Sequence, residues 1–200
     1  MLDYTTWKYK LMGGKGAPVK VIEAYLANHK WTHKETERDS TDAIVYHWVA
    51  KAGQRAVDTI AFMNTRIGSY GASNYVIDLD GTIYITVNQE YVAFHAGSDK
   101  GYTDLAVRLF GKKGTAKTSS PNWHSVGIEM CHPNWEGEFT EETLHSAAWL
   151  GAKLCRDYNL KPHQHALTHQ MVVGWKNCPK WMVDNPQDFE ELRWKILNAM

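Results

Sequence analysis

The stretch Ala43-Ile-Val-Tyr-His-Trp-Val49 decides the fold expected for this chain of 200 residues. Successive side chains of a β-strand point to opposite faces of the sheet. Both faces of this stretch are largely apolar, since Ile, Tyr and Trp alternate with Val, His and Val. Strands of this kind lie at the centre of a sheet that is covered on both sides, as in α/β proteins. The stretch therefore predicts an α/β fold in which His47 is a lone polar residue of a central strand.

The composition agrees with one compact domain over residues 1–200. A hydrophobic content of 44%, with 12% aromatic residues, is enough for a core of its own. The 22 Lys and Arg residues balance the 22 Asp and Glu residues, and no clustered basic excess indicates a nucleic-acid surface. No stretch is long and apolar enough to span a membrane. We therefore expect neither nucleic acid nor a membrane as a partner.

Apolar residues recur at helical spacing in four parts of the chain. The helices expected from this spacing cover Pro18–Lys30, Ala52–Ile67, Glu141–Tyr158 and the segment after Asn185. Thr140 can cap the third helix, whose first two residues are acidic and favour its positive end. Asn185-Pro186 is a cap and first-turn pair for the last helix, which directs Phe189, Leu192 and Ile196 inward.

Three other segments complete the expected order of elements. They are a hairpin whose strands 74–78 and 82–87 flank a tight Asp80-Gly81 turn, a polar loop over 29–40, and a loop over 100–122 that contains one helical turn at 105–110. No internal repeat or low-complexity segment divides the chain.

A further strand is expected over Ser125–Cys131, and its alternation gives Glu129 a defined direction. Glu129 shares a face with Gly127, where the absence of a side chain leaves room for a ligand to approach. A carboxylate aimed into such a space is a candidate catalytic group. The alternative is a Glu that faces solvent on a half-exposed strand, which is the ordinary place for this residue type.

The segment His169-Gln-Met-Val-Val-Gly-Trp-Lys-Asn-Cys-Pro179 brings together an imidazole, an ammonium and a thiol. Zinc takes His nitrogen and Cys thiolate as ligands, and a catalytic zinc needs only three protein ligands, so that water can occupy the fourth position. His169 and Cys178 supply two, and His47 is the best candidate for the third. Each has an ordinary alternative, because a strand histidine is often a hydrogen-bonded core residue and a free cysteine often packs as a small hydrophobe.

Four stretches of the chain, taken in order, resemble one family. They are Ile44-Val-Tyr-His47, the hairpin Ser73 to Tyr84, Val92-Ala-Phe-His-Ala-Gly97, and Ser125-Val-Gly-Ile-Glu129 with His169 to Pro179. Over about residues 40–198 the chain is similar to the zinc-dependent N-acetylmuramoyl-L-alanine amidases of the type 2 family. That family also contains phage endolysin catalytic domains and the peptidoglycan recognition proteins. The resemblance implies a central mixed β-sheet flanked by helices.

The resemblance also implies a reaction. One zinc ion (Zn²⁺) per chain would be held by His47, His169 and Cys178, with Glu129 and Lys176 as the catalytic side chains. Glu129 would take a proton from water and return it to the leaving amine, while Lys176 would stabilise the oxyanion. The substrate would be bacterial peptidoglycan, cleaved between the lactyl group of N-acetylmuramic acid and L-alanine. Such enzymes include phage or prophage endolysins and bacterial autolysins.

Two positions depart from the family pattern. His169 precedes Cys178 by nine positions, one more than in many relatives, so Trp175 resembles a one-residue insertion in the ligand loop. Ser73 stands where some relatives carry a catalytic Tyr, which groups this chain with the relatives that use a Glu at position 129.

Several assignments stay open. His163 and His165 are near His169 in sequence and could compete for the metal, although His169 alone keeps a near-family distance to Lys176 and Cys178. The side chains expected to line the substrate cleft are Trp48, Asn74, His95 and Trp175. The alternative for these four is packing, or contact with a metal ligand rather than with substrate.

Two other functions belong to the same fold. One is a non-catalytic peptidoglycan-binding module, in which the Cys ligand is typically replaced. The other is a cytoplasmic muropeptide-recycling amidase, in which the third ligand is usually Asp. Cys178 argues against both.

Three cysteines, Cys131, Cys155 and Cys178, leave an odd thiol in any disulfide framework and so predict reduced thiols. The first residues lack a basic region followed by an apolar run, so we expect no secretory signal. Synthesis in a cytoplasm is then expected, with action on the wall after release, through a holin if the source is a phage. A wall-binding domain would be separate or removed.

Overall fold

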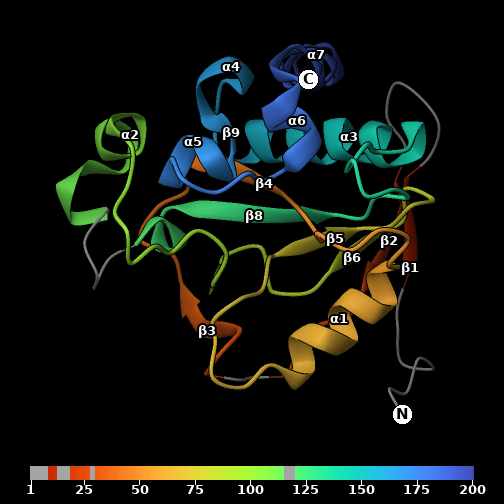
Figure 1. Ribbon diagram of the computed structural model, residues 1–200, viewed down its shortest axis with the longest axis horizontal. Helices are drawn as coiled ribbons and strands as arrows, with labels where there is room; N and C mark the ends of the chain where they lie inside the picture. The colour runs from red at the N-terminus through yellow and green to blue at the C-terminus, as the bar shows by residue number, and fades with distance from the viewer. Residues whose placement is uncertain (1–8, 13–18, 28–29, 115–119) are drawn as a thin grey trace.

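A mixed β-sheet of seven strands forms the centre of the computed structural model (Figure 1), which describes residues 9–12, 19–27, 30–114 and 120–200. The strand order is β1-β2-β6-β5-β8-β4-β9. These strands are β1 (Tyr9–Met12), β2 (Val19–Glu23), β4 (Ala43–Trp48), β5 (Tyr75–Ile77), β6 (Ile83–Ile85), β8 (Ser125–Met130) and β9 (Ala166–Thr168). A separate two-stranded ribbon pairs β3 (His33–Glu37) with β7 (Tyr91–Ala93).

Strand β4 lies between β8 and β9 and runs parallel to both. Its first four residues, Ala43 to Tyr46, are 0% exposed, which confirms the central position expected from the two apolar faces. Strands β5 and β6 pair antiparallel through a turn in which Gly81 has a φ of 77°, so the expected hairpin is also confirmed. Because β5 runs parallel to β8, the sheet is mixed.

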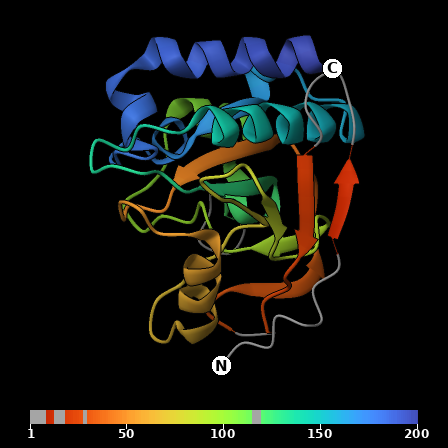
Figure 2. The same ribbon diagram turned by 90° about the vertical axis from the view of Figure 1, so that its right-hand side faces the viewer.

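Helices cover both faces of the sheet. They are α1 (Ala56–Thr65), α2 (Asp104–Gly114), α3 (Glu141–Asp157), α4 (Pro162–His165), α5 (His169–Val173), α6 (Lys180–Asp184) and α7 (Pro186–Ala199), and a 3₁₀ turn covers Pro121–Trp123. Helices α3 and α7 lie on one face, with α7 outside α3, and α1 lies on the other (Figures 1 and 2). No helix among the described residues is long and apolar enough to cross a membrane. The architecture is the single α/β domain expected from the sequence.

Alternation along the central strands divides their side chains between two cores. Tyr46 and Ile128 belong to the core beneath α3 and α7, where the Tyr46 ring meets the Phe189 ring edge-on at 6.0 Å between centroids. Val76 belongs to the core on the opposite face, with Ile60 of α1. The side chains that precede or follow Tyr46 and Ile128 therefore point toward the α1 side of the sheet.

The two long C-terminal helices begin where their capping residues predict. Thr140 Oγ1 accepts a hydrogen bond from the Thr143 backbone N–H at 3.1 Å, which satisfies one of the free donors at the start of α3. Pro186 opens α7 as expected, but the Asn185 side chain donates to the Trp181 carbonyl instead of capping the helix. The inward residues of α7 are Phe189, Leu192 and Ile196, all nearly fully buried as predicted.

The helix expected over Pro18–Lys30 is wrong. Val19–Glu23 forms strand β2, which runs parallel to β6 and antiparallel to β1. The run Val-Lys-Val-Ile-Glu is rich in β-branched residues, which favour a strand, and an available sheet edge overrides the helical spacing. Tyr25, which lies within the expected helix, follows the strand and is 53% exposed. Pro18 and residues 28–29 lie outside the described residues.

Two segments expected as loops contain regular structure. His33–Glu37 forms strand β3, which is mostly exposed and pairs with β7. Its side chains are polar and show no apolar alternation, so only the backbone pairing with β7 identifies this segment as a strand. Asp104–Gly114 forms α2 where one helical turn was expected, and Ala106 and Phe110 pack with Val172 of α5. The local sequence pattern does not predict α2 at its full length, because the contact with α5 comes from a distant part of the chain. Residues 115–119 of the expected loop lie outside the described residues.

The packing of α3 on β4 makes a prediction for Gly151. A Cβ at this position would lie 2.4 Å from Tyr46 Oη and 3.0 Å from Ile196 Cδ1. Gly151→Ala should therefore lower the free energy of unfolding by about 1–3 kcal/mol through overpacking, measured by urea denaturation. Helix propensity alone would raise it by about 1 kcal/mol, so an increase in stability would contradict this packing.

Candidate metal and catalytic site

Parallel pairing of β4 with β8 places His47 directly beside Glu129, because the two residues are partners in the strand register. Each follows a core residue, Tyr46 or Ile128, that points toward α3. Both side chains therefore point to the α1 side, near the carboxyl ends of the two strands. Open α/β sheets commonly bind ligands outside the carboxyl ends of their strands.

Strand β9 and helix α5 bring the other two candidate ligands to the same place. β9 pairs with β4 on the side away from β8, and His169 is the first residue of α5 after β9. Helix α5 ends at Gly174, which has a φ of 80°. The chain then turns back, so that the Gln170 N–H donates to the Cys178 carbonyl at 3.0 Å. This short loop holds Cys178 next to His169.

His47, His169 and Cys178 form a group that could hold a metal ion. One potential ligand atom from each lies within 4.8 Å of the others, and all three side chains are buried. Cys178 Sγ lies 3.7 Å from His47 Nδ1, close to the separation of about 3.6 Å expected for two such ligands on tetrahedral zinc. Both ring nitrogens of His169 are buried without a hydrogen-bond partner. A buried polar atom of this kind is costly unless an ion or water satisfies it, so the residues fit a metal.

A chain of hydrogen bonds sets the direction of the His47 lone pair. His95 Nε2 lies 3.3 Å from the Ser125 carbonyl oxygen, which can only accept, so this nitrogen carries the proton. His95 Nδ1 then accepts from His47 Nε2–H at 3.1 Å. The lone pair of His47 is left on Nδ1, which faces Cys178. Hydrogen bonds of this type hold metal-binding histidines in one tautomer.

Burial controls the protonation of the candidate ligands. It lowers the pKa of His47 well below its ordinary value and that of His169 to about 3, so both imidazoles are neutral and free to donate a lone pair. Burial also raises the pKa of the Cys178 thiol to about 12. Since the thiolate is the ligand, a bound cation must favour its deprotonation.

Glu129 lies beside this group with a free carboxylate. No hydrogen bond or ion pair from the described residues reaches its carboxylate, and burial raises its pKa to about 8, opposed by the charges of Lys176 and Arg66. A carboxyl group with a raised pKa and no partner is typical of a general acid or base.

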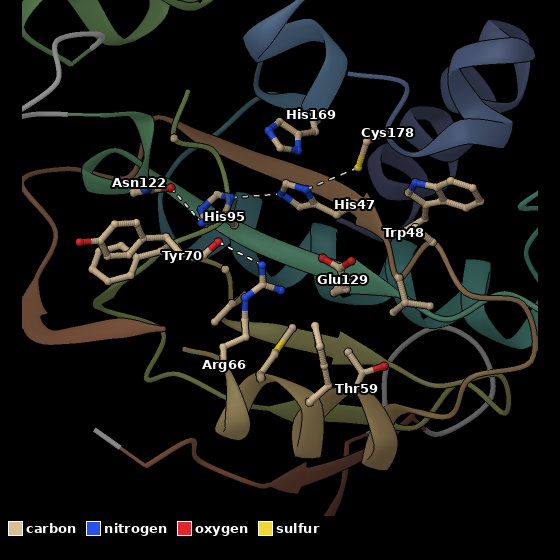
Figure 3. A pocket seen from close by; sticks show the side chains of 18 of the residues that line it. His47, Trp48, Thr59, Arg66, Tyr70, His95, Asn122, Glu129, His169 and Cys178 are labelled. Atoms are coloured by element: carbon tan, nitrogen blue, oxygen red, sulfur yellow. Dashed lines mark hydrogen bonds between the residues drawn. The ribbon is translucent and has the colours of Figure 1, made fainter. Parts of the chain in front are cut away.

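The site opens into a groove of about 870 Å³ between α1 and the ligand loops. In Figure 3, Trp48 and Thr59 lie at one end, Tyr70 and Asn122 lie at the other, and Glu129 lies between them. His95 and Lys176 also line the groove. The structure therefore brings together seven of the nine predicted site residues: His47, His169, Cys178, Glu129, Lys176, Trp48 and His95.

Asn74 does not line the groove, and its expected role in lining the cleft is wrong. The side chain is 0% exposed; its amide donates to the carbonyls of Asn88 and Tyr91, and its oxygen accepts from the Gly127 N–H. Asn74 instead links β8, and the chain from Asn88 to the first residue of β7, to the start of β5. Asn74 is therefore a buried structural residue, because its side-chain amide makes hydrogen bonds to three backbone groups.

Trp175 lies at the rim and is not among the residues lining the groove. It is 49% exposed, donates from Nε1 to Ser98 Oγ at 3.1 Å, and has Lys100 Nζ 4.4 Å from its ring centre. Trp175 therefore contacts the segment around Ser98 and Lys100, while Cys178 lies with His47 and His169. Ser73 is fully buried, and its hydroxyl donates to the Tyr75 carbonyl, which keeps it from any catalytic position.

His163 and His165 are not part of the group that could hold a metal. They lie in α4, at the opposite end of β9 from His169. The His165 Nδ1 accepts from the Lys161 N–H at 2.8 Å, and His163 lies 3.4 Å from Glu190. The preference for His169 over these two residues is thus supported by their positions.

One wall of the groove was not predicted. Thr59, Phe62, Met63 and Arg66 line it from α1 and its C-terminal end. Their spacing puts them on one helical face, and a mixture of polar and apolar residues on that face was the available signal. The helix was expected, but not which of its faces meets the site.

The chain belongs to the N-acetylmuramoyl-L-alanine amidase family, because the Amidase_2 family model matches residues 37–181. A probable N-acetylmuramoyl-L-alanine amidase from Bacillus licheniformis is 29% identical in an alignment of 174 positions that covers 84% of this chain and 45% of that protein. The chain thus spans less than half the length of this relative.

Solved structures share the fold. A mutant endolysin from Bacillus subtilis aligns with a TM-score of 0.63 at 19% identity, covering 89% of this chain and 99% of that one. The N-acetylmuramoyl-L-alanine amidase LysC from Clostridium intestinale aligns with a TM-score of 0.59 at 23% identity, covering 90% and 98%. The mixed sheet and its flanking helices are therefore those of amidase catalytic domains.

The ligand geometry predicts which substitutions remove the metal. Cys178→Ser and His169→Ala should each lose most of the bound metal, because each removes one of three buried ligands. His165→Ala is the matched control and should keep it. Elemental analysis of purified proteins measures the outcome; metal loss in His165→Ala with retention in His169→Ala would show that the ligand set is wrong.

The raised pKa of Glu129 makes a prediction for stability. Between the ordinary pKa of 4.5 and the folded value of about 8, the folded metal-free protein binds more protons than the unfolded chain, so stability falls as pH rises. Glu129→Gln removes this dependence. Thermal melts after chelation should show the variant gaining stability over the wild type from pH 5 to pH 8. A constant difference between the two proteins would contradict a buried carboxyl here.

Proposed function

We propose that this protein is a zinc-dependent peptidoglycan hydrolase that cleaves the amide bond between N-acetylmuramic acid and L-alanine. The observation that carries the proposal is the group of His47, His169 and Cys178 beside the unpartnered Glu129 in one groove. Membership of the amidase family supports the choice of this bond, as do two relatives from Bacillus licheniformis that are named as N-acetylmuramoyl-L-alanine amidases.

Zinc is the metal that we propose for this donor set. Two imidazole nitrogens and one thiolate are borderline-soft ligands that suit tetrahedral zinc, whereas magnesium and calcium prefer oxygen. Catalytic zinc sites have three protein ligands, whereas structural zinc sites have four. We expect one zinc ion per chain.

The side chains around the ligands have separate roles in the proposed reaction. Zinc held by His47, His169 and Cys178 would supply a Lewis acid that lowers the pKa of water and polarises the scissile carbonyl. Glu129 accepts the proton of the attacking water and passes it to the leaving nitrogen of L-alanine. The raised pKa of Glu129 favours this second transfer, because a carboxyl group with a pKa near neutrality both accepts and releases a proton.

Lys176 stabilises negative charge on the carbonyl oxygen as the amide becomes tetrahedral. It lies two residues before Cys178, lines the groove, and its charge acts on His47, His169 and Glu129. The ammonium group is therefore near the reacting centre without being a metal ligand.

Two related functions fit the site less well. A non-catalytic peptidoglycan-binding module needs neither a complete ligand set nor Glu129, and both are present here. A muropeptide-recycling amidase typically has Asp in the position that Cys178 occupies. We therefore favour the wall-hydrolysing enzyme.

The end groups released from purified cell walls test the proposed bond. An N-acetylmuramoyl-L-alanine amidase releases new amino groups on L-alanine and no new reducing sugars. We expect that result, abolished by a chelator and restored by zinc. New reducing ends, or new amino groups on other stem residues, would assign the enzyme to a different bond.

Glu129 and Lys176 should act on the transition state without holding the metal. Glu129→Gln should keep its zinc and lose about two to four orders of magnitude in kcat, the range for a positioned general base. Lys176→Ala should lose about two to three orders of magnitude as one oxyanion contact. Steady-state assays with metal analysis check both. Near-normal kcat in Glu129→Gln at full zinc content would assign the proton transfer to another group.

A further inference from the structure

The groove carries an excess of positive charge that the proposed reaction does not explain. Among the described residues that line it, Lys34, Arg66 and Lys176 are cations, and Glu129 is the one carboxylate. None of these three cations has an ion-pair partner within the described residues. The formal net charge of the whole chain is +0, so the excess is local. Such a groove favours an anionic ligand.

Contacts with neighbouring residues fix the Arg66 side chain in a position where it can bind an anion. Its Nε and Nη2 donate to the Ser69 carbonyl, the Ser69 hydroxyl and the Tyr70 carbonyl at 3.1–3.4 Å. Its guanidinium also lies 5.1 Å from the Phe62 ring centre. These contacts fix the plane of the guanidinium, while no hydrogen bond from the described part of the chain uses Nη1. A fixed guanidinium with free N–H groups is suited to bind a carboxylate.

Arg66 lies close to the reacting centre. Figure 3 shows its guanidinium rising from α1 between Glu129 and Tyr70, on the wall opposite the metal ligands. Its charge lowers the pKa of Glu129 against the effect of burial. A group bound to Arg66 would therefore lie only a short way along the substrate from the bond that is cleaved.

We propose that Arg66 is a specificity residue that binds the free α-carboxylate of the second residue of the stem peptide. This inference rests on the proposed amidase function, because it takes the scissile bond to lie at Glu129. In stems of the type L-alanyl-γ-D-glutamyl, that carboxylate lies two residues from the scissile carbonyl, roughly 7 Å in an extended chain. Some stems carry an uncharged carboxamide at the same place. The enzyme then prefers the free acid.

Lys34 supports the proposal from another part of the groove. It belongs to β3, and its Nζ lies 5.0 Å from the ring centre of Trp123. Its position supplies a second cation in the groove that can attract the acidic stem. Among the described cations of the groove, Arg66 alone combines a fixed plane with free donors beside Glu129, so it is the residue that gives selectivity.

Two synthetic ligands that differ only in this group provide the test. They are N-acetylmuramoyl-L-alanyl-γ-D-glutamyl-L-lysine and its analogue with a D-isoglutamine carboxamide. Binding is measured by calorimetry to zinc-loaded Glu129→Gln, which separates recognition from turnover. Cleavage of both is measured with the zinc-loaded wild type. A charge-assisted pair predicts about 10- to 150-fold tighter binding of the acid.

Three further variants, made in the Glu129→Gln background, assign the preference to Arg66. Arg66→Gln should remove it, with little change in affinity for the carboxamide, and Arg66→Lys should retain part of it. Gly71→Ala should reduce the preference for the free acid while the charge of Arg66 stays the same. The new Cβ would lie 2.9 Å from Arg66 Cζ and displace the guanidinium. Lys195→Gln is the control, since Lys195 pairs with Glu191 on α7, away from the groove.

Each outcome decides the matter. Equal affinity for the two ligands, or a preference that survives in Arg66→Gln, overturns the proposal even if both ligands are cleaved. Loss of the preference in Arg66→Gln supports Arg66 as the residue that binds the carboxylate. If the wild type then cleaves neither ligand, the proposed amidase function is contradicted while the role of Arg66 in binding stands. No binding of either ligand overturns both.

Discussion

The parallel register between β4 and β8 is the constraint on which the site depends. It sets His47 beside Glu129 on the α1 side of the sheet, while Tyr46 and Ile128 enter the core under α3. A slip of one residue would send one of the two polar side chains into that core. The parallel pairing of β9 on the other edge of β4 then brings His169 and its loop to the same place.

The packing around His47 is specialised for this arrangement. His95 lies against Gly127, where a Cβ would be 2.5 Å from His95 Cγ, so only glycine lets the ring reach His47. Asn122 accepts from the backbone N–H groups of His95 and Ala96 and fixes that segment. The site also keeps the nitrogens of His169 unpartnered. A metal that binds only the folded chain would stabilise it by mass action.

Local patterns predicted the parts of the fold that local interactions determine. The two apolar faces of Ala43–Val49 and the capped stripe of Glu141–Tyr158 gave a central strand and a long helix. Strand β2 and helix α2 were missed because each is selected by a distant partner, β6 and α5. In the site, residue chemistry and family resemblance indicated the ligands and Glu129. The position of Arg66 in the groove and the structural role of Asn74 depend on how distant segments pack together, which a local sequence pattern does not predict.

X-ray absorption at the zinc edge tests whether His47, His169 and Cys178 hold the ion, because it reports the atoms bound to zinc rather than the activity that follows. We expect two nitrogen neighbours and one sulfur neighbour, at about 2.0–2.1 Å and 2.3 Å, with one lighter atom from solvent. Cys178→Ser should remove the sulfur signal from any zinc that remains. A wild-type spectrum without sulfur would show that zinc does not lie between β4 and the loop after α5.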